Sequence, residues 1–300
     1  MITKKLDLIG LFNEMYLDGK HMFRVYYAGK PLFSVTLGDF ANIRAIISKD
    51  EMEEKEEMPS YEDLLMCFWA SNALKWKNQE EIKKKLEKAV KRDLYRGDKK
   101  LYLSFDSCVL RHRSNAVIRN FLLRFKKYLG VVMPTGVLAE LKGWDKKYKN
   151  VNDLKASVFG ANRFLGQPVL SARKLKIGDI EARSLVKSTY TSKIESEKDD
   201  ENIIFALKTY QQEKDVDVLV FSEDSNFVEM ARDEKIHAEL IIQEKKIPLT
   251  IECSWEKLRD LIYMTAIVFG AIKMDKYKVW GIWSGKTPDN WYEEEVDVEG

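Results

Sequence analysis

Residues 101–243 alternate between short apolar runs and segments in which apolar side chains recur at spacings of three and four. The apolar runs are LYLSF, VVMP and VDVLVFS. The periodic segments are NAVIRNFLLRFKKYL, TGVLAELKGW, IIFALKTYQQE and NFVEMARDE. Short apolar runs are typical of buried strands. Apolar side chains that recur every three or four residues are typical of amphipathic helices. Their alternation predicts an α/β fold with a central parallel sheet and helices on both faces.

The chain on either side of this region has a different pattern. Residues 1–97 contain two strand-like runs, FRVYYAG and PLFSVTL, followed by two amphipathic segments, which predicts an α+β unit. Residues 244–300 contain a strand candidate, a long apolar helix with Ser254 as its N-cap, and two terminal strands. We therefore expect three consecutive segments, 1–97, 98–243 and 244–300, with the first boundary at Arg96-Gly97-Asp98.

Composition indicates a globular protein whose charge is unevenly distributed. A chain of 300 residues that is 45% hydrophobic can bury a large core, and its net charge of +2 does not by itself indicate a nucleic-acid partner. Between Arg111 and Lys193, however, 18 Lys and Arg face five acids, so this stretch carries +13 and the remainder −11. Such a stretch attracts phosphate backbones. The alternative is that the acidic flanks neutralise it in the folded protein.

Cysteine usage and hydropathy favour a reducing, cytoplasmic setting. The three cysteines lie far apart and predict neither a disulfide framework nor a zinc site. The N-terminal residues do not resemble a signal peptide. The longest apolar run, Leu261–Ile272, is about half the roughly 20 residues that span a bilayer, so we expect a buried helix and no membrane partner.

Acidic residues stand at or beside the ends of the apolar runs. Asp106 and Asp224 directly follow strand-like segments, and the carboxyl ends of parallel strands meet at one edge of a sheet. Glu140 and the pair Asp199-Asp200 lie beside two other apolar segments. Carboxylates gathered in one site repel one another unless cations bind, and their hard oxygens select Mg²⁺ or Mn²⁺. The alternative for each acid is a helix N-cap or a turn residue.

In this order, the four acidic segments resemble the motifs of the PIN-domain family of metal-dependent nucleases. The resemblance covers residues 101 to about 243 and rests on Asp106-Ser107-Cys108-Val109-Leu110, on Pro134, Val137, Glu140 and Leu141, on Asp200 with Ile203, and on Ser222 with Asp224. It implies that Asp106, Glu140, Asp200 and Asp224 are the catalytic metal ligands. Asp199 is the alternative third ligand, ranked behind Asp200.

The chain departs from a minimal PIN domain between Glu140 and Asp200. This interval is longer than the family pattern, so we expect a basic insertion at about 144–193. Glu223 adjoins Asp224, and since side chains alternate along a strand, only one of the two should point into the site.

The resemblance implies a metal-dependent endoribonuclease that acts in RNA processing or decay, with Mg²⁺ or Mn²⁺ as cofactor. RNA is the expected partner, and the oligomeric state is left open, a homo-oligomer included. A structure-specific DNA nuclease and a non-catalytic RNA-binding or assembly protein are the alternatives. The expected nucleic-acid contacts are Arg111, His112, Arg113, Arg163, Arg173, Lys174, Lys176 and Arg183.

Overall fold

The computed structural model divides the chain into two compact units. It describes residues 2–4, 8–52, 59–125, 127–142, 167–189, 191–281 and 295–299. The first unit comprises Met1–Leu74, Trp144–Lys174 and Lys245–Gly300, and the second comprises Lys75–Gly143 and Leu175–Glu244. The units thus interleave along the sequence, whereas the local pattern predicts three consecutive segments, because pairing between distant strands leaves no local signature.

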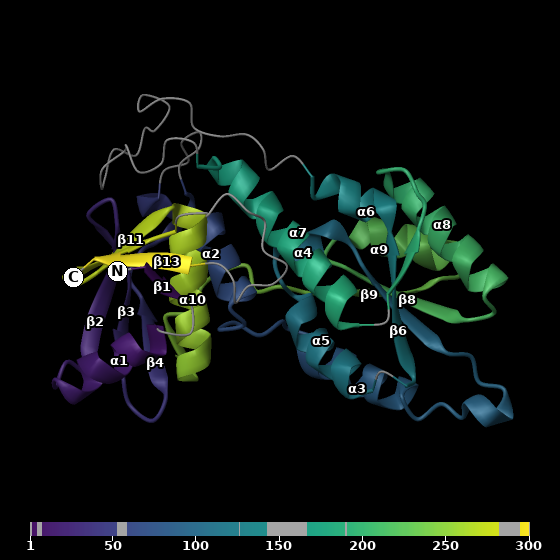
Figure 1. The fold of residues 1–300 in the computed structure, drawn as a ribbon, viewed down its shortest axis with the longest axis horizontal. Helices are drawn as coiled ribbons and strands as arrows, with labels where there is room; N and C mark the ends of the chain where they lie inside the picture. Colours follow the sequence, from purple (N-terminus) through teal and green to yellow (C-terminus); the bar gives the residue numbers. More distant parts are fainter. Residues whose placement is uncertain are drawn as a thin grey trace. The chain divides into compact units, whose positions relative to one another are not determined.

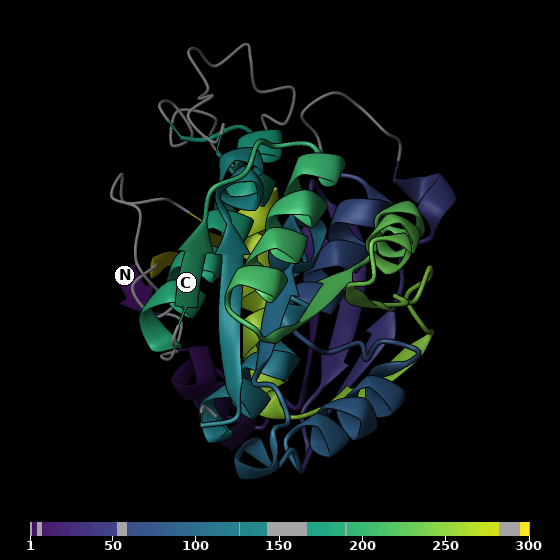
Figure 2. The ribbon, with the colours of Figure 1, turned by 90° about the vertical axis from the view of Figure 1, so that its right-hand side faces the viewer.

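The second unit is built on a five-stranded parallel sheet in the order β7-β6-β5-β8-β9, flanked by helices (Figures 1 and 2). Its strands are β5 (Leu101–Phe105), β6 (Leu129–Pro134), β7 (Thr191–Ile194), β8 (Asp217–Ser222) and β9 (His237–Leu240). The predicted α/β fold is confirmed. The chain winds outward from β5 through β6 to β7 and then returns to β8 on the other side of β5. This reversal makes the β5–β8 junction a topological switch point, where open α/β sheets bind their ligands.

Helices connect the strands of the second unit. They are α3 (Gln79–Ala89), α4 (Ser107–Arg111), α5 (Asn115–Arg124), α6 (Thr135–Glu140), α8 (Asp200–Glu213) and α9 (Ser225–Asp233), and α7 (Leu170–Ser188) runs across the unit boundary. α8 packs against β6, β8 and α9. The segments predicted as helices by their periodicity are helical, with α5 and α6 ending earlier than the apolar pattern does.

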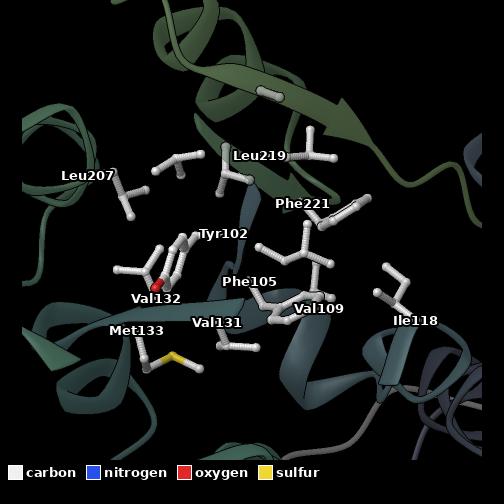
Figure 3. Close-up of a cluster of buried hydrophobic side chains, with 14 of the residues drawn as sticks. Tyr102, Phe105, Val109, Ile118, Val131, Val132, Met133, Leu207, Leu219 and Phe221 are labelled. Atoms are coloured by element: carbon white, nitrogen blue, oxygen red, sulfur yellow. The ribbon is translucent and has the colours of Figure 1, made fainter. Parts of the chain in front are cut away.

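The core of the second unit lies around the two central strands (Figure 3). Every residue of β5 is buried, as expected for a strand with helices on both faces. Phe105 and Phe221 pair in register, and their rings stack with centroids 5.7 Å apart. Truncating a buried phenylalanine costs about 3–5 kcal/mol. This packing fixes the position of the strand ends, and hence of the residues that follow them.

Strand β7 was not predicted from the sequence. Its residues, TSKI, carry little apolar surface and are half-buried or exposed. The strand lies at the edge of the sheet and pairs with β6 in parallel, from Val131 opposite Thr191 to Pro134 opposite Ile194. An edge strand buries less surface than a central one, so its sequence is less constrained and its pattern is weaker. The segment expected as a basic insertion therefore contains part of the sheet itself.

The first unit contains an eight-stranded antiparallel sheet in the order β1-β13-β12-β11-β2-β3-β4-β10. Its strands are β1 (Ile2–Lys4), β2 (Met22–Tyr27), β3 (Lys30–Thr36), β4 (Ala41–Ala45), β10 (Thr250–Cys253), β11 (Ala271–Met274), β12 (Tyr277–Trp280) and β13 (Glu295–Glu299). The hairpin predicted from FRVYYAG and PLFSVTL is confirmed as β2–β3. Ala28 and Gly29 turn it with φ of 54° and 76°, the left-handed conformation that tight hairpins need.

Helices α1 (Leu8–Leu17), α2 (Tyr61–Ala70) and α10 (Trp255–Phe269) complete the first unit. The predicted start of α10 is confirmed, because Ser254 occupies the N-cap position in extended conformation. From Leu261 to Phe269 every residue of α10 is buried. Among the residues described, the structure has no helix whose length and hydropathy would suit a membrane span.

Candidate active site

Asp106 lies where β5 ends and α4 begins, beside the switch point. Its Oδ1 accepts a hydrogen bond of 2.5 Å from the backbone N–H of Ser107, and its Oδ2 accepts one of 2.6 Å from Oγ of Ser222. The thiol of Cys108 donates to the same Oδ2 at 3.1 Å. The carboxylate is 9% exposed and is held by three donors. Oδ1 still has a lone pair available for a ligand, whereas Oδ2 already accepts two hydrogen bonds.

Glu140 is the last residue of α6 and lies within electrostatic range of Asp106. Partial burial raises the pKa of Glu140 above its ordinary value, and the charges of Asp106 and Asp200 raise it further. A hydrogen bond from the side chain of Ser107 and the positive charge of Arg111 oppose this shift. Ser107 therefore supports two acids at once, through its backbone N–H for Asp106 and its hydroxyl for Glu140.

Asp199 and Asp200 have different environments at the start of α8. Asp199 is the N-cap, with Oδ1 accepting from the backbone N–H of Asn202 at 2.9 Å and Oδ2 from its side-chain amide at 2.7 Å. These bonds lower the pKa of Asp199. For Asp200, burial raises the pKa, and the charges of Asp106, Asp224 and Asp199 add to the effect. Asp200 is thus the one of the two that shares a charge environment with Asp106 and Asp224.

Asp224 follows β8 and caps α9. Its Oδ1 accepts a hydrogen bond from the backbone N–H of Asn226 at 2.8 Å, and its own backbone N–H donates to Oγ of Ser222 at 2.9 Å. The neighbouring Glu223 is engaged elsewhere: its Oε2 lies 2.6 Å from Nδ1 of His112, and its Oε1 accepts from Ser114 at 2.7 Å. Of Glu223 and Asp224, it is Asp224 whose charge contributes to the raised pKa of Asp200.

The fold thus gathers four acids, Asp106, Glu140, Asp200 and Asp224, from four places in the sequence to the carboxyl edge of the parallel sheet. Burial raises the pKa values of Glu140 and Asp200, and the negative charges of the neighbouring acids raise them further. Within the described part of the chain, no three His, Cys, Asp or Glu side chains form a group that could hold one metal ion. Caps and hydrogen bonds hold Asp106 and Asp224 in their present positions.

Comparison with protein families agrees with this geometry. Residues 105–241, which contain all four acids and strands β6 to β9, match the family model of the PIN domain. This segment is a PIN domain. No curated protein matches the chain. The PIN domain is a nuclease-type fold that generally works with divalent metal ions. The carboxyl edge of the sheet is therefore the candidate active site.

Three of the expected nucleic-acid contacts adjoin the site of the PIN domain. The charge of Arg111 acts on Glu140, and its buried Nε meets no hydrogen-bond acceptor in the described part of the chain. His112 is bonded to Glu223 through Nδ1. Arg113 is 8% exposed, and its Nε donates to Oε1 of Glu181 at 2.5 Å. Arg111 therefore lies within electrostatic range of one of the four acids, whereas Arg113 is a buried partner of Glu181 and does not fit the expected role.

The other expected contacts are dispersed. Arg173 is 2% exposed, and its guanidinium donates to the carbonyls of Pro168, Ile267 and Gly281, so its expected contact with nucleic acid does not fit this burial. Lys176 is equally buried. Lys174 pairs with Asp63 at 2.8 Å, and Arg183 with Asp179 at 3.0 Å. Arg163 lies outside the described residues.

Sequence reasoning missed the neutral side chains that hold the acids. Cys108 is half-buried, and desolvation of its thiol together with the charges of Asp106 and Glu223 raises its pKa well above the usual value, so it stays a neutral donor. Gln243 donates to both Ser114 and Glu223, at 2.7 and 3.0 Å. The sequence positions of Cys108 and Ser222 could have indicated their roles, because each lies two residues from an acid at the end of a strand. No motif identifies Gln243, which comes from beyond β9.

Proposed function

We propose that this chain is a metal-dependent endoribonuclease that hydrolyses RNA phosphodiester bonds in RNA processing or decay. The observation that carries the proposal is the position of Asp106, Glu140, Asp200 and Asp224 at the carboxyl edge of a PIN domain, where burial and the neighbouring acids raise the pKa of Glu140 and Asp200. Raised carboxylate pKa values in a cluster mark a site with an unbalanced negative charge.

The donor set fits a hard divalent cation. Asp106, Glu140, Asp200 and Asp224 offer carboxylate oxygens alone, the ligands that Mg²⁺ and Mn²⁺ prefer. Bound ions of this kind supply Lewis acidity and an activated water for phosphodiester hydrolysis. The four acids would hold the ions, and cation binding would relieve the repulsion that adds to the effect of burial on the pKa values of Glu140 and Asp200.

The remaining groups position the ligands and the substrate. Hydrogen bonds from Ser222, Cys108 and the N–H of Ser107 fix the orientation of the Asp106 carboxylate. Because the carboxylate is already oriented, it needs little rearrangement when a ligand binds. Arg111 brings a positive charge close to Glu140, where a substrate phosphate would approach the acids. A guanidinium suits this role because its fixed donors match the oxygens of a phosphate group.

The function is tested by incubating the full chain with labelled single-stranded RNA and the matching DNA, with Mn²⁺ and with a chelator. We expect RNA cleavage that needs Mn²⁺ and falls by about 100-fold or more in Asp106→Asn, since even indirect support of a metal ligand is worth about 10–100-fold. Asp233→Asn, at the exposed end of α9, is the matched control and keeps full activity.

Mn²⁺ binding is measured in parallel by electron paramagnetic resonance. Preferential cleavage of DNA would favour the structure-specific DNA nuclease. RNA binding without cleavage, together with no difference in Mn²⁺ binding between the parent and Asp106→Asn, would favour a non-catalytic RNA-binding protein. Equal cleavage by the parent and Asp106→Asn would refute the assigned site.

A further inference from the structure

A groove of about 640 Å³ lies in the second unit between α8 and the end of β7. The α8 side chains that line it recur at spacings of three and four, so they form one stripe along the helix. Phe205 belongs to this stripe and is 67% exposed, while Tyr210 and Ile194 add apolar surface at the base. Since β7 is the edge strand, no further strand of the sheet covers this side of the groove in the described residues.

The charged residues that line the groove are all acidic. Glu195 and Glu197 come from the loop after β7, and Glu213 is the last residue of α8. No lysine or arginine is among the described residues that line it. An exposed phenylalanine between carboxylates repels a phosphate backbone but suits a chain that offers both positive charge and apolar side chains.

The walls of the groove are held in place before any ligand arrives. The hydroxyl of Thr135 accepts a 2.9 Å hydrogen bond from the N–H of Ser196 and donates to the Ser196 carbonyl at 3.2 Å. The N–H of Gly136 donates to Oγ of Ser196 at 2.9 Å, and the hydroxyl of Tyr210 donates to Oγ of Ser192 at 2.9 Å. Preformed walls reduce the ordering cost of binding.

We propose that this groove binds a basic, extended segment of a partner protein. An aliphatic or aromatic side chain of the segment packs on Phe205, and its lysines or arginines pair with Glu195, Glu197 and Glu213. None of the four proposed metal ligands lines the groove, and the proposal holds whether or not the chain cleaves RNA.

Fluorescence anisotropy with labelled peptides of about ten residues, roughly 33 Å when extended, tests this site on the full chain. The basic probe alternates lysine and arginine with leucine and tyrosine, the acidic probe carries glutamate in place of the basic residues, and the neutral probe carries serine. We expect saturable binding of the basic probe alone, weakened by salt. Phe205→Ala and Glu213→Lys should each weaken it about tenfold, the scale of a single interface anchor.

Glu87→Lys is the matched control, because it makes the same charge change on the exposed face of α3 in the same unit. It leaves binding of the basic probe unchanged. The groove variants stay folded, since Phe205 and Glu213 are exposed and a lysine at the end of α8 favours the helix dipole. Circular dichroism verifies this.

Several results would overturn the proposal. They are no binding of the basic probe, equal loss in Glu87→Lys, equal binding of the neutral probe, and loss of RNA affinity in Phe205→Ala, which would make the groove a nucleic-acid site. A concentration-dependent dimer that Phe205→Ala dissociates would instead assign the groove to a second copy of the chain.

Discussion

The hydroxyl of Ser222 donates a 2.6 Å hydrogen bond to Oδ2 of Asp106, joining the end of β8 to the first residue after β5. The same Oγ accepts the backbone N–H of Asp224 at 2.9 Å. One fully buried hydroxyl therefore links the carboxylate of Asp106 to the backbone of Asp224, two of the proposed metal ligands. This link depends on the parallel register of the two strands, which places Phe105 opposite Phe221.

Ser222→Ala should lower nuclease activity by about 10–100-fold, because Asp106 loses a donor that orients it. It should also lower the free energy of unfolding by about 1–3 kcal/mol, the cost of an unsatisfied buried partner. Steady-state cleavage and urea unfolding measure the two effects. Ser225→Ala, on the exposed first turn of α9, is the control and should change neither. Unchanged activity in Ser222→Ala would show that this hydroxyl does not position Asp106.

Replacing the adjacent acids at the start of α8 should separate their roles. Asp200→Ala is expected to abolish most activity and weaken Mn²⁺ binding, since Asp200 shares the charge environment of Asp106 and Asp224. Asp199→Ala is expected to keep activity and lower the melting temperature slightly, since Asp199 caps the helix through Asn202. The reverse pattern would make Asp199 the third ligand.

The buried pair of Glu181 and Arg113 predicts a stability that depends on pH. Burial alone would raise the pKa of Glu181, but Arg113, with smaller effects of Arg119 and Asn115, holds it below the ordinary value of a glutamate. Its contribution is therefore complete above that ordinary pKa, about 4.3, and is lost as the pH falls through the lower folded-state pKa. Glu181→Gln leaves Arg113 buried without its counter-charge and should cost about 3–5 kcal/mol at neutral pH.

Urea unfolding at steps from pH 7 to about pH 3 measures this effect for the parent and Glu181→Gln. The difference between the two free energies of unfolding should shrink as the pH falls. Glu87→Gln, an exposed replacement on α3, should follow the parent at every pH. A difference that stays constant with pH would mean that the charge of Glu181 is not what stabilises the fold.

Two glycines should respond to alanine in opposite ways. A Cβ at Gly136 would lie 1.8 Å from the carbonyl oxygen of Glu197, so Gly136→Ala must push the loop after β7 away from α6. We expect a loss of about 1–3 kcal/mol and reduced activity, because α6 carries Glu140. At Gly10, in α1, a Cβ would meet nothing within 4 Å, and Gly10→Ala should stabilise by about 0.5–1 kcal/mol. Thermal unfolding of both variants compares them directly, and a stable, active Gly136→Ala would contradict the close approach.

The acids at the strand ends of the PIN domain could be predicted because their signal in the sequence is local. Asp106 and Asp224 each follow a run of apolar residues, and parallel strands bring such ends to one edge. The structure also places Glu140 and Asp200 near them, which the order of the segments suggested through the family resemblance. The positions of these acids could be predicted without knowing which distant residues are in contact.

The supporting residues were not predictable because their roles arise from tertiary contacts. Arg113 and Arg173 appear in a basic stretch and suggest a phosphate surface, yet both donate hydrogen bonds to buried partners far along the chain. Strand β7 was not predicted because an edge strand need not be apolar. Ser222 and Gln243 act through hydrogen bonds to acids that are distant in sequence. Composition cannot distinguish a buried arginine from an exposed one.

The interleaved units have a consequence for the order in which the chain can fold during synthesis. All five strands of the parallel sheet have been made once Leu240 leaves the ribosome, and they lie within about half of the chain. The antiparallel sheet instead pairs β2 with β11, whose residues are synthesised almost 250 positions later, and closing so long a loop is slow. The nuclease-type unit can thus form while β2, β3 and β4 still wait for their remaining partners. Until then the edge of β2 that later pairs with β11 stays without its partner strand.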